Sequence, residues 1–443
     1  MPRPLIVELA EGPSLRASLV PLLILALAIC AGFTTMTSFG IMAESAKAEL
    51  GLSDEALGAI QGVSAAVPLV LLSIPIGILV DRASRVRILF AFSLIWTIGT
   101  FLTALAPEAW SLFGGRMMTG IGATGALTAC LSLTADLCRP AERGKGLLIV
   151  TLGKSVGQAA AFSLTGWLIG YYAASGVAPL LGGLSPWRSS QLALGIGSAL
   201  LVLPLFLLRE PARQEVEQAG KPAMRVVFGE LWSRRAFLLP LFVGQTGVVM
   251  ADAAAGIWAA PIIERQFGLR PADFSGLLGT IILVSGLAGA LIGGLAADWG
   301  SKTGRRGGLL LGALIAAVVG VPAALFPLLP TATGTMLVLG LLILAGTVTG
   351  LVTSVALTVL LPNEIRGLSI GAFISVAGLI GFGIAPPLVA IVSKPLGGES
   401  ALGLAQGLVG VLVSLMSVWG FWLAMRRAPD EATSRKGLDL PLR

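Results

Sequence analysis

The amino-acid sequence predicts an all-α membrane protein with twelve transmembrane helices in two pseudo-symmetric six-helix bundles. Of its 443 residues, 55% are hydrophobic and only 12% are charged, whereas a soluble domain carries roughly 25% charged residues. The apolar residues form runs that are each long enough to cross about 30 Å of hydrocarbon. In addition, a pattern of residues in the first half of the chain recurs in the second half.

The predicted spans form two sets of six, separated by a polar stretch. The first set lies near 19–43, 55–80, 88–106, 110–135, 146–171 and 189–208, and the second near 236–262, 274–297, 307–327, 333–361, 367–393 and 402–425. The first run is too long for the apolar region of a cleavable signal peptide, so we expect it to remain as a helix. The runs predict an N-terminal bundle over 1–208, a cytoplasmic linker over 209–235, a C-terminal bundle over 236–426 and a cytoplasmic tail over 427–443.

The lysine and arginine residues are distributed unequally between the two sides of the predicted membrane. Of the 30, 23 lie in the N-terminus, the connections after even-numbered spans and the C-terminus. Two lie within spans, and the five on the opposite side are Lys47, Arg188, Arg265, Arg270 and Lys394. By the positive-inside rule, both termini are cytoplasmic, and we expect the chain in a bacterial inner membrane. Because the basic residues act as topology signals in many short loops, the net charge of +7 does not indicate nucleic-acid binding.

The residue types present argue against several kinds of catalytic site. The chain has no histidine and three cysteines, which lack metal-ligand spacing and form no even disulfide set. No G-x-x-x-x-G-K-[ST] motif occurs, which argues against a self-contained ATP-driven pump. A membrane-embedded enzyme would need clustered nucleophiles, acids or metal ligands in its spans. We therefore expect no enzymatic activity, no metal and no cofactor.

An internal repeat relates the two halves. The segment Gly-Ile-Leu-Val-Asp-Arg-Ala-Ser-Arg at Gly77–Arg85 matches Gly-Leu-Ala-Ala-Asp-Trp-Gly-Ser-Lys at Gly294–Lys302, 217 positions further along. The pair Gly51-Leu52 matches Gly268-Leu269 at the same offset. Six helices return the chain to the same side of the membrane, so the halves run parallel. Such an arrangement places a substrate site between the halves, near the midplane.

These motifs resemble those of the major facilitator superfamily. The G-x-L-x-D-R-x-x-R core at Gly77–Arg85 resembles the loop signature of that family, and its degenerate copy at Gly294–Arg306 lies where the family repeats it. The segment Arg116–Gly122 resembles the arginine-containing motif of the fourth helix. The resemblance covers nearly the whole chain and implies transport of a small solute by alternating access.

A narrower resemblance is to bacterial spinster-like members of this superfamily. It is carried by Glu49–Asp54, Ile74–Arg85, Ser132–Asp136 and Gly383–Pro386. Spinster relatives usually carry an Asp-Arg pair in the first helix and a Glu after the Gly-x-Gly of the fourth. The matching positions here are Thr35, Met36 and Ala123. The loss of all three charges places both the proton-coupling device and the substrate of that branch in question.

Charged residues at the cytoplasmic ends of the spans form a candidate gate. The resemblance implies that Asp81 faces the N-terminal end of the eleventh helix, where the helix dipole favours a carboxylate by roughly 0.3–1 kcal/mol. Arg85 could also pair with Asp136. Such contacts would hold the cytoplasmic side shut in one of two states; alternatively, the arginines only set the topology. The candidate gate residues are Gly77, Asp81, Arg82, Arg85, Asp136, Arg143, Asp298, Glu364 and Arg366.

Asp252 is the one carboxylate deep inside a predicted span. A charge at such a depth costs at least about 2.5–3.5 kcal/mol, so we expect it to face the bundle interior. It would bind a coupling proton or a cationic group of the substrate; the alternative is a structural hydrogen bond between helices. The offset of 217 aligns it with Thr35. This predicts a polarised site, basic on the side of the first half and acidic on the side of the second.

Two cations lie within the first-half spans. Lys154, with Gln158 one turn further on the same face, would attract an anionic group; alternatively, its side chain reaches the headgroups. The resemblance implies that Arg116 faces the cavity near the first helix. Without an acidic neighbour, its guanidinium must be satisfied by water, a backbone carbonyl or an anionic substrate. The remaining candidates for substrate or ion binding are Thr34, Thr35 and Gln245, for which the alternatives are bonds to the same helix and packing.

The predicted function is therefore secondary active transport of a small organic or amphipathic solute, lysolipid-like on the spinster resemblance and coupled to protons. The alternatives are an uncoupled uniporter, an organic-anion carrier that uses Arg116 and Lys154, and a membrane sensor that does not transport. The expected partners are the small-molecule substrate, membrane lipid and protons, and we expect a monomer.

Overall fold

The computed structural model of the chain describes residues 13–139, 142–174, 183–212, 229, 231–303, 307–361 and 363–429. Within these ranges, the side chains at 69, 70, 73, 74, 81, 363–372 and 374 are not described. The predicted tail, from residue 430 onward, and most of the predicted linker lie outside the described residues.

The first half consists of long helices joined by short connections. The first span is made of α1 (Leu19–Thr37) and α2 (Phe39–Leu50), which meet at Ser38. The others are α3 (Asp54–Arg82), α4 (Arg85–Leu105), α5 (Ala109–Leu137), α6 (Arg143–Ala174) and α7 (Pro186–Val202), the last continued by a 3-10 turn over Leu203–Leu207.

The second half repeats this organisation. Its long helices are α9 (Arg235–Phe267), α10 (Pro271–Lys302), α11 (Leu311–Ala323), α12 (Ala332–Leu360), α13 (Asn363–Leu396) and α14 (Leu402–Arg426). Short 3-10 turns over Gly308–Leu310, Phe326–Leu328 and Gly398–Ala401 flank α11 and precede α14. In the described part of the chain, eleven spans are long and apolar enough to cross a membrane. The 29-residue α3 completes the predicted twelve.

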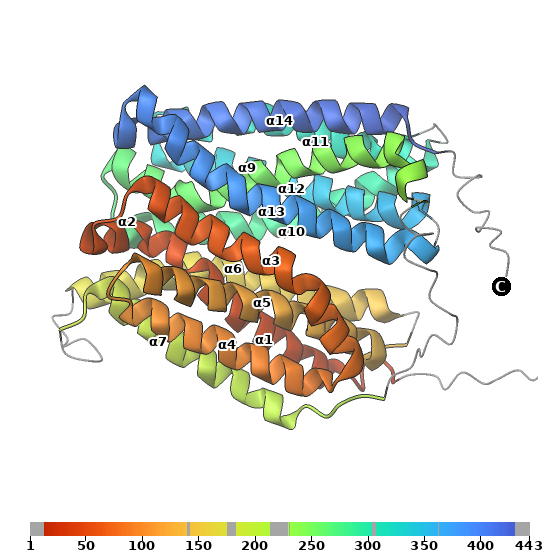
Figure 1. Ribbon diagram of the computed structural model, residues 1–443, viewed down its shortest axis with the longest axis horizontal. Helices are drawn as coiled ribbons and strands as arrows, with labels where there is room; N and C mark the ends of the chain where they lie inside the picture. The colour runs from red at the N-terminus through yellow and green to blue at the C-terminus, as the bar shows by residue number, and fades with distance from the viewer. Residues whose placement is uncertain are drawn as a thin grey trace, which may run out of the picture.

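The helices gather into two bundles that lie side by side (Figure 1). Helices α1 to α7 form one and α9 to α14 the other, and the pairs α6/α10 and α3/α13 make the main contacts between them. The first and the last described residues, 13 and 429, lie at one end of the molecule, here called the terminal end; the opposite end is called the distal end. The predicted fold, an all-α membrane protein of two six-helix bundles, is confirmed.

The backbone also carries the internal repeat. Gly51 ends the first span with φ of 62°, and Gly268 ends α9 with φ of 65°. Both lie in the left-handed region, where glycine avoids the penalty of a Cβ atom. The next helices begin at Asp54 and Pro271, which are again 217 positions apart. The two halves therefore make the same turn at the same place.

Most helices are longer than the apolar runs that predicted them. The first span continues to Leu50 instead of residue 43, and α13 covers Asn363–Leu396 instead of 367–393. An apolar run marks the part of a helix that lies in hydrocarbon, whereas the backbone hydrogen bonds continue through polar residues outside it.

Candidate functional site

The two halves touch closely in the distal half of their contact helices. A Cβ atom at Gly62 of α3 would lie 2.3 Å from the carbonyl oxygen of Phe382 on α13. A Cβ atom at Gly166 of α6 would lie 1.9 Å from the hydroxyl oxygen of Ser275 on α10. Small residues of this kind let two membrane helices approach until their backbones touch. The halves are therefore tightly packed on this side of the midplane.

Ion pairs connect the halves at the distal end. Arg265 of α9 donates to both oxygens of Glu44 on α2, at 2.6 and 3.0 Å, and to both oxygens of Asp54 on α3, at 2.7 and 2.9 Å. Lys47 lies 2.7 Å from Asp54 and 2.6 Å from Glu399 of the second half. These five residues are here called the distal cluster. The guanidinium of Arg265 thus binds both oxygens of each carboxylate, and this bidentate geometry is the one in which arginine binds carboxylates most strongly.

Two further cations at this end are also paired. Lys394 of α13 lies 2.7 Å from Glu55 of α3, which gives another link between the halves. Arg188 of α7 lies 2.6 Å from Glu49 of α2, within the first half. Residue Glu264, next to Arg265, has one carboxylate oxygen that is buried without a hydrogen-bond partner among the described residues. The distal end is thus closed by charge as well as by packing.

At the terminal end, the predicted pairing of Arg85 with Asp136 is confirmed. The same guanidinium donates to Glu210 at 2.9 Å and to the carbonyl oxygen of Pro211 at 3.1 Å. Burial opposes ionisation of Glu210, but hydrogen bonds from the Val86 amide and the Arg85 side chain outweigh it and lower the pKa of the carboxyl. These groups belong to the first half or to the start of the linker that follows it, so Arg85 fastens the end of one bundle and does not bridge the two.

The other candidate gate side chains at the terminal end that the structure describes are exposed or form a hydrogen bond within their own half. Arg82 and Asp298 are exposed, and Arg143 donates to the carbonyl oxygen of Ala135 in its own half, at 2.9 Å. Apart from its own stretch of helix, no described atom lies within 4 Å of the place that a Cβ would take at Gly77. The side chains of Asp81, Glu364 and Arg366 lie outside the described part, so their role remains a prediction.

Arg116 is satisfied by the backbone at the end of α1. It donates to the carbonyl oxygens of Thr35, at 3.4 Å, and Met36, at 2.5 Å, and its guanidinium lies 5.1 Å from the ring centre of Phe39. A cation at a helix C-terminus binds carbonyls that lack a partner within the helix. Of the three possibilities predicted for this guanidinium, the structure gives the backbone carbonyl, and Arg116 closes the break between α1 and α2. Its Nε atom is buried without a partner among the described residues.

Lys154 lies on α6 with its ammonium 5.2 Å from the ring centre of Phe33 on α1. It forms no ion pair with a described carboxylate, and its side chain is partly buried, as is that of Gln158. Thr34 joins the same two helices, since its hydroxyl lies 3.1 Å from the carbonyl oxygen of Gly157 and 2.8 Å from that of Cys30. Lys154 and Arg116 thus both contact the first span, at Phe33 and at Phe39, which are six positions or about 9 Å apart.

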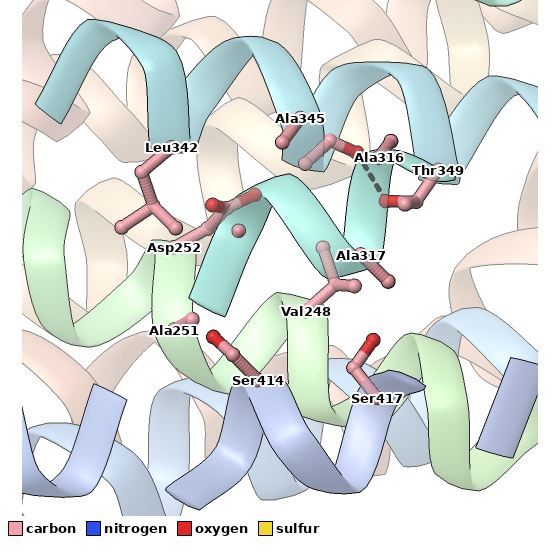
Figure 2. A pocket seen from close by; sticks show the side chains of 12 residues that line it. Val248, Ala251, Asp252, Ala316, Ala317, Leu342, Ala345, Thr349, Ser414 and Ser417 are labelled. Carbon is pink, nitrogen blue, oxygen red and sulfur yellow. Dashed lines mark hydrogen bonds between the residues drawn. The ribbon is translucent and has the colours of Figure 1, made fainter. Parts of the chain in front are cut away.

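Asp252 lies elsewhere, inside the C-terminal bundle. It lines a cavity of about 20 Å³ formed by α9, α11, α12 and α14, all of the second half. Figure 2 shows Asp252, Ser414 and Ser417 around this cavity, with Thr349 bonded to its own helix. One oxygen of Asp252 and the hydroxyl of Ser417 are buried without a described partner. About 10–15 Å³ suffices for a water molecule that has several polar partners, so the cavity has room for one.

The structure therefore does not bring Asp252 together with Arg116 and Lys154, as the predicted polarised site would require. Thr35, at the equivalent place in the first half, is fully buried, and its hydroxyl bonds to carbonyls of its own helix. Gln245, also predicted, accepts a hydrogen bond from Thr353 of α12 at 3.0 Å, again within the second half. These contacts agree with the alternative predictions, which were bonds to the same helix for Thr35 and packing for Gln245.

The distal cluster was not among the predicted site residues, although the sequence contains a signal for it. All five basic residues that depart from the charge distribution expected of a membrane protein are paired with a carboxylate in the structure. A cation on the unfavoured side of the membrane, close to an acidic residue in a short loop, would have indicated the cluster.

Comparisons with known proteins agree with this architecture. The family model of the Major Facilitator Superfamily matches residues 24–386. The chain is 26% identical to the 3-(3-hydroxy-phenyl)propionate transporter of Escherichia coli (strain K12), over 80% of this chain and 81% of that protein. It is also 26% identical to the cis,cis-muconate transport protein of Acinetobacter baylyi, over 73% and 75%.

Among solved structures, a bacterial homologue of the human lysosomal transporter Spinster, inward-facing and occupied, aligns with a TM-score of 0.78. It covers 94% of this chain and 98% of its own, at 22% identity, a likeness that concerns the fold. The length matched by the family model, the two six-helix bundles and the similar proteins all indicate the same family. The chain is a member of the Major Facilitator Superfamily, an integral membrane protein that acts as a secondary transporter of small solutes.

Proposed function

We propose that the chain transports a small organic acid by alternating access, and that Lys154 attracts the carboxylate of the solute. The observation that carries this proposal is the environment of the Lys154 ammonium, which lies within a span and has no ion-pair partner among the described carboxylates. A charge inside a membrane is costly and is usually retained for function. An anionic solute would supply the missing counter-charge.

The surroundings of Lys154 suit an unsaturated or aromatic acid. The Phe33 ring beside the ammonium offers an apolar face, and aromatic rings favour offset or edge contacts with other planar groups. Both relatives named above carry organic acids according to their names, one of them aromatic and the other an unsaturated diacid. Arg116, already bound to two carbonyls, would hold the first span in shape beside this site.

We propose that the transport cycle alternates between the described state, closed at the distal end, and a state in which the distal cluster is broken. If the termini are cytoplasmic, as the distribution of basic residues predicts, the described state faces inward. Exposed apolar side chains on the terminal half of α3, such as Leu71 at 66% and Ile78 at 48%, support an opening on that side. Figure 1 shows α3 curving away from α13 toward the terminal end.

We propose further that transport is coupled to protons and that Asp252 carries the proton. The carboxyl has a small cavity beside it, hydroxyl groups around it and no described cation paired with it. A water molecule in that cavity would allow proton exchange without exposure of the group to lipid. An uncoupled uniporter remains the competing mechanism.

Uptake by proteoliposomes tests the proposed organic-acid substrate and the proposed coupling to protons. The substrates would be 3-(3-hydroxyphenyl)propionate, cis,cis-muconate, an uncharged amide of the first, and a lysophospholipid, each with and without an imposed pH gradient. We expect uptake of at least one acid, little uptake of the amide, and stimulation by the gradient. Uptake of the lysophospholipid alone would contradict the organic-acid proposal and support the class suggested by the spinster resemblance. Binding without flux would indicate a sensor.

Two variants separate the proposed role of Lys154 in binding the acid from that of Asp252 in carrying the proton. Lys154→Gln should reduce acid uptake at least tenfold, whereas Lys145→Gln, at the exposed start of the same helix, should leave it unchanged. Asp252→Asn should remove the response to the pH gradient while the acid still binds. Equal loss for both lysine variants would contradict the role of Lys154, and an unaltered pH response in Asp252→Asn would contradict proton coupling through that residue.

A further inference from the structure

A groove lies between α9 and α14 at the terminal end of the C-terminal bundle. It has a volume of about 490 Å³ and opens on the outside of the bundle. Its walls come from the first turns of α9 and the last turns of α14, and the Asp252 cavity shares no residue with it. Volumes of 300–1,000 Å³ are typical of sites that hold a small molecule.

The deep part of the groove is apolar. Leu239, Pro240 and Val243 of α9 face Trp419 and Leu423 of α14 across it. Leu239 and Trp419 are each 55% exposed although they lie on membrane-spanning helices. Protein side chains do not cover these surfaces, so in a membrane acyl chains would contact them.

The shallow part of the groove is basic. Arg235 is the first residue of α9 and Arg427 directly follows α14, so both guanidinium groups lie at the mouth. Arg235 donates to the carbonyl oxygen of Trp232 at 2.9 Å and lies 5.1 Å from the ring centre of that residue, which restricts its position. Neither arginine forms an ion pair with a carboxylate of the described residues. Two cations therefore remain available for an anion beside an apolar slot.

We propose that this groove binds one anionic phospholipid of the leaflet that faces the terminal end. Its phosphate would contact Arg235 and Arg427, and an acyl chain would run along Leu239 and Val243 toward Trp419. Arginine binds phosphate in a bidentate manner, and basic pockets at membrane helices on the cytoplasmic side recognise acidic headgroups. From Arg427 to Trp419 is eight residues or about 12 Å of helix, so the slot extends from the headgroup region into the hydrocarbon.

Native mass spectrometry of the full-length protein in detergent, with phosphatidylglycerol or phosphatidylcholine added, tests this proposal. The double variant Arg235→Gln/Arg427→Gln removes two charges at the groove, and the control Arg87→Gln/Lys145→Gln removes two exposed charges at the same end of the other bundle. We expect about 30-fold weaker phosphatidylglycerol binding in the groove variant, since each basic residue near a membrane surface contributes about fivefold. The control should bind like the wild type.

Val243→Trp provides a second variant that fills the slot and keeps both charges. It should also weaken phosphatidylglycerol binding, and phosphatidylcholine should bind weakly to every protein. Equal binding of the two lipids by the wild type would overturn the proposal. So would an equal loss in the control, or wild-type affinity in both groove variants.

Discussion

Replacing Arg265 by glutamine should shift the transporter toward a state that is open at the distal end. The guanidinium makes four hydrogen bonds to two carboxylates of the other half, and its side chain is 17% exposed. A hydrogen bond to a charged group contributes about 1.5–3 kcal/mol net. Partial exposure weakens such pairs, so we count about 1.5 kcal/mol for each carboxylate and about 3 kcal/mol together. Since about 1.4 kcal/mol corresponds to a factor of ten, the equilibrium should move on the order of 100-fold.

Distance measurements between spin labels at the distal end would detect this shift. The exposed positions Trp110 and Thr333, one at the distal end of each half, are suitable after the three native cysteines are replaced. The glutamine variant should show a second, longer distance. Arg265→Lys, which keeps the charge but loses the fork, should show a smaller shift. Arg270→Gln is the matched control, because among the described carboxylates Arg270 pairs only with Asp273, in the first turn of the following helix. An unchanged distance distribution in Arg265→Gln, or an equal change in the control, would refute the role of the distal cluster in keeping the distal end closed.

Three further predictions concern packing, the Asp252 cavity and pH. Gly157→Val should destabilise the purified protein by about 1–3 kcal/mol, because even a Cβ there would lie 2.4 Å from a carbonyl oxygen of α1. Gly144→Ala, in open space on the same helix, should leave the melting temperature unchanged. Equal melting temperatures of the two variants would contradict this reasoning. Gly346→Ala should suppress the pH response of uptake without loss of folded protein, because its Cβ would lie 2.0 Å from an Asp252 oxygen and displace the carboxyl; a normal pH response would count against it. The lowered pKa of Glu210 stabilises the folded state fully above the ordinary value of 4.5, and this contribution is lost as pH falls from there through the lowered value. The melting temperatures of wild type and Glu210→Gln should therefore differ at pH 7 and approach each other as pH falls below 4.5, and a constant difference would refute this role.

The order and number of the spans could be predicted because the membrane sets a minimum length for each apolar run. The repeat could be predicted because Gly51 and Gly268 keep the same backbone conformation in both halves. The ends of the helices could not, because residues such as Glu44 and Lys47 continue α2 beyond the apolar run and serve the distal cluster.

The candidate site was only partly predictable. The pairing of Arg85 with Asp136 joins two adjacent spans of one bundle, so the positions of the two residues at the cytoplasmic ends of their spans sufficed to suggest it. The pairing of Arg265 with Glu44 joins residues more than 200 positions apart and depends on how the two halves meet. For Asp252, the sequence predicts its depth in the span but not whether its side chain points toward the other half or into its own bundle. The reason is that α9 is mostly buried, so its apolar residues do not mark one face.

The two halves differ most at the place where the repeat aligns Thr35 with Asp252. In the first half, Arg116 of α5 reaches the backbone beside Thr35. Helices α5 and α12 both have 29 residues and begin at Ala109 and Ala332, so the equivalent of Arg116 in the second half is Leu339. A guanidinium is thus absent where the carboxyl is present, and within the described part of the chain Asp252 faces hydroxyls and a cavity instead of a counter-ion. A carboxyl in such a place is suited to exchange a proton, whereas a paired carboxylate would be held ionised by its partner. On the function proposed above, the absence of a cation at Leu339 and of an acid at Thr35 would separate the two tasks, with anion attraction in the first bundle and proton exchange in the second.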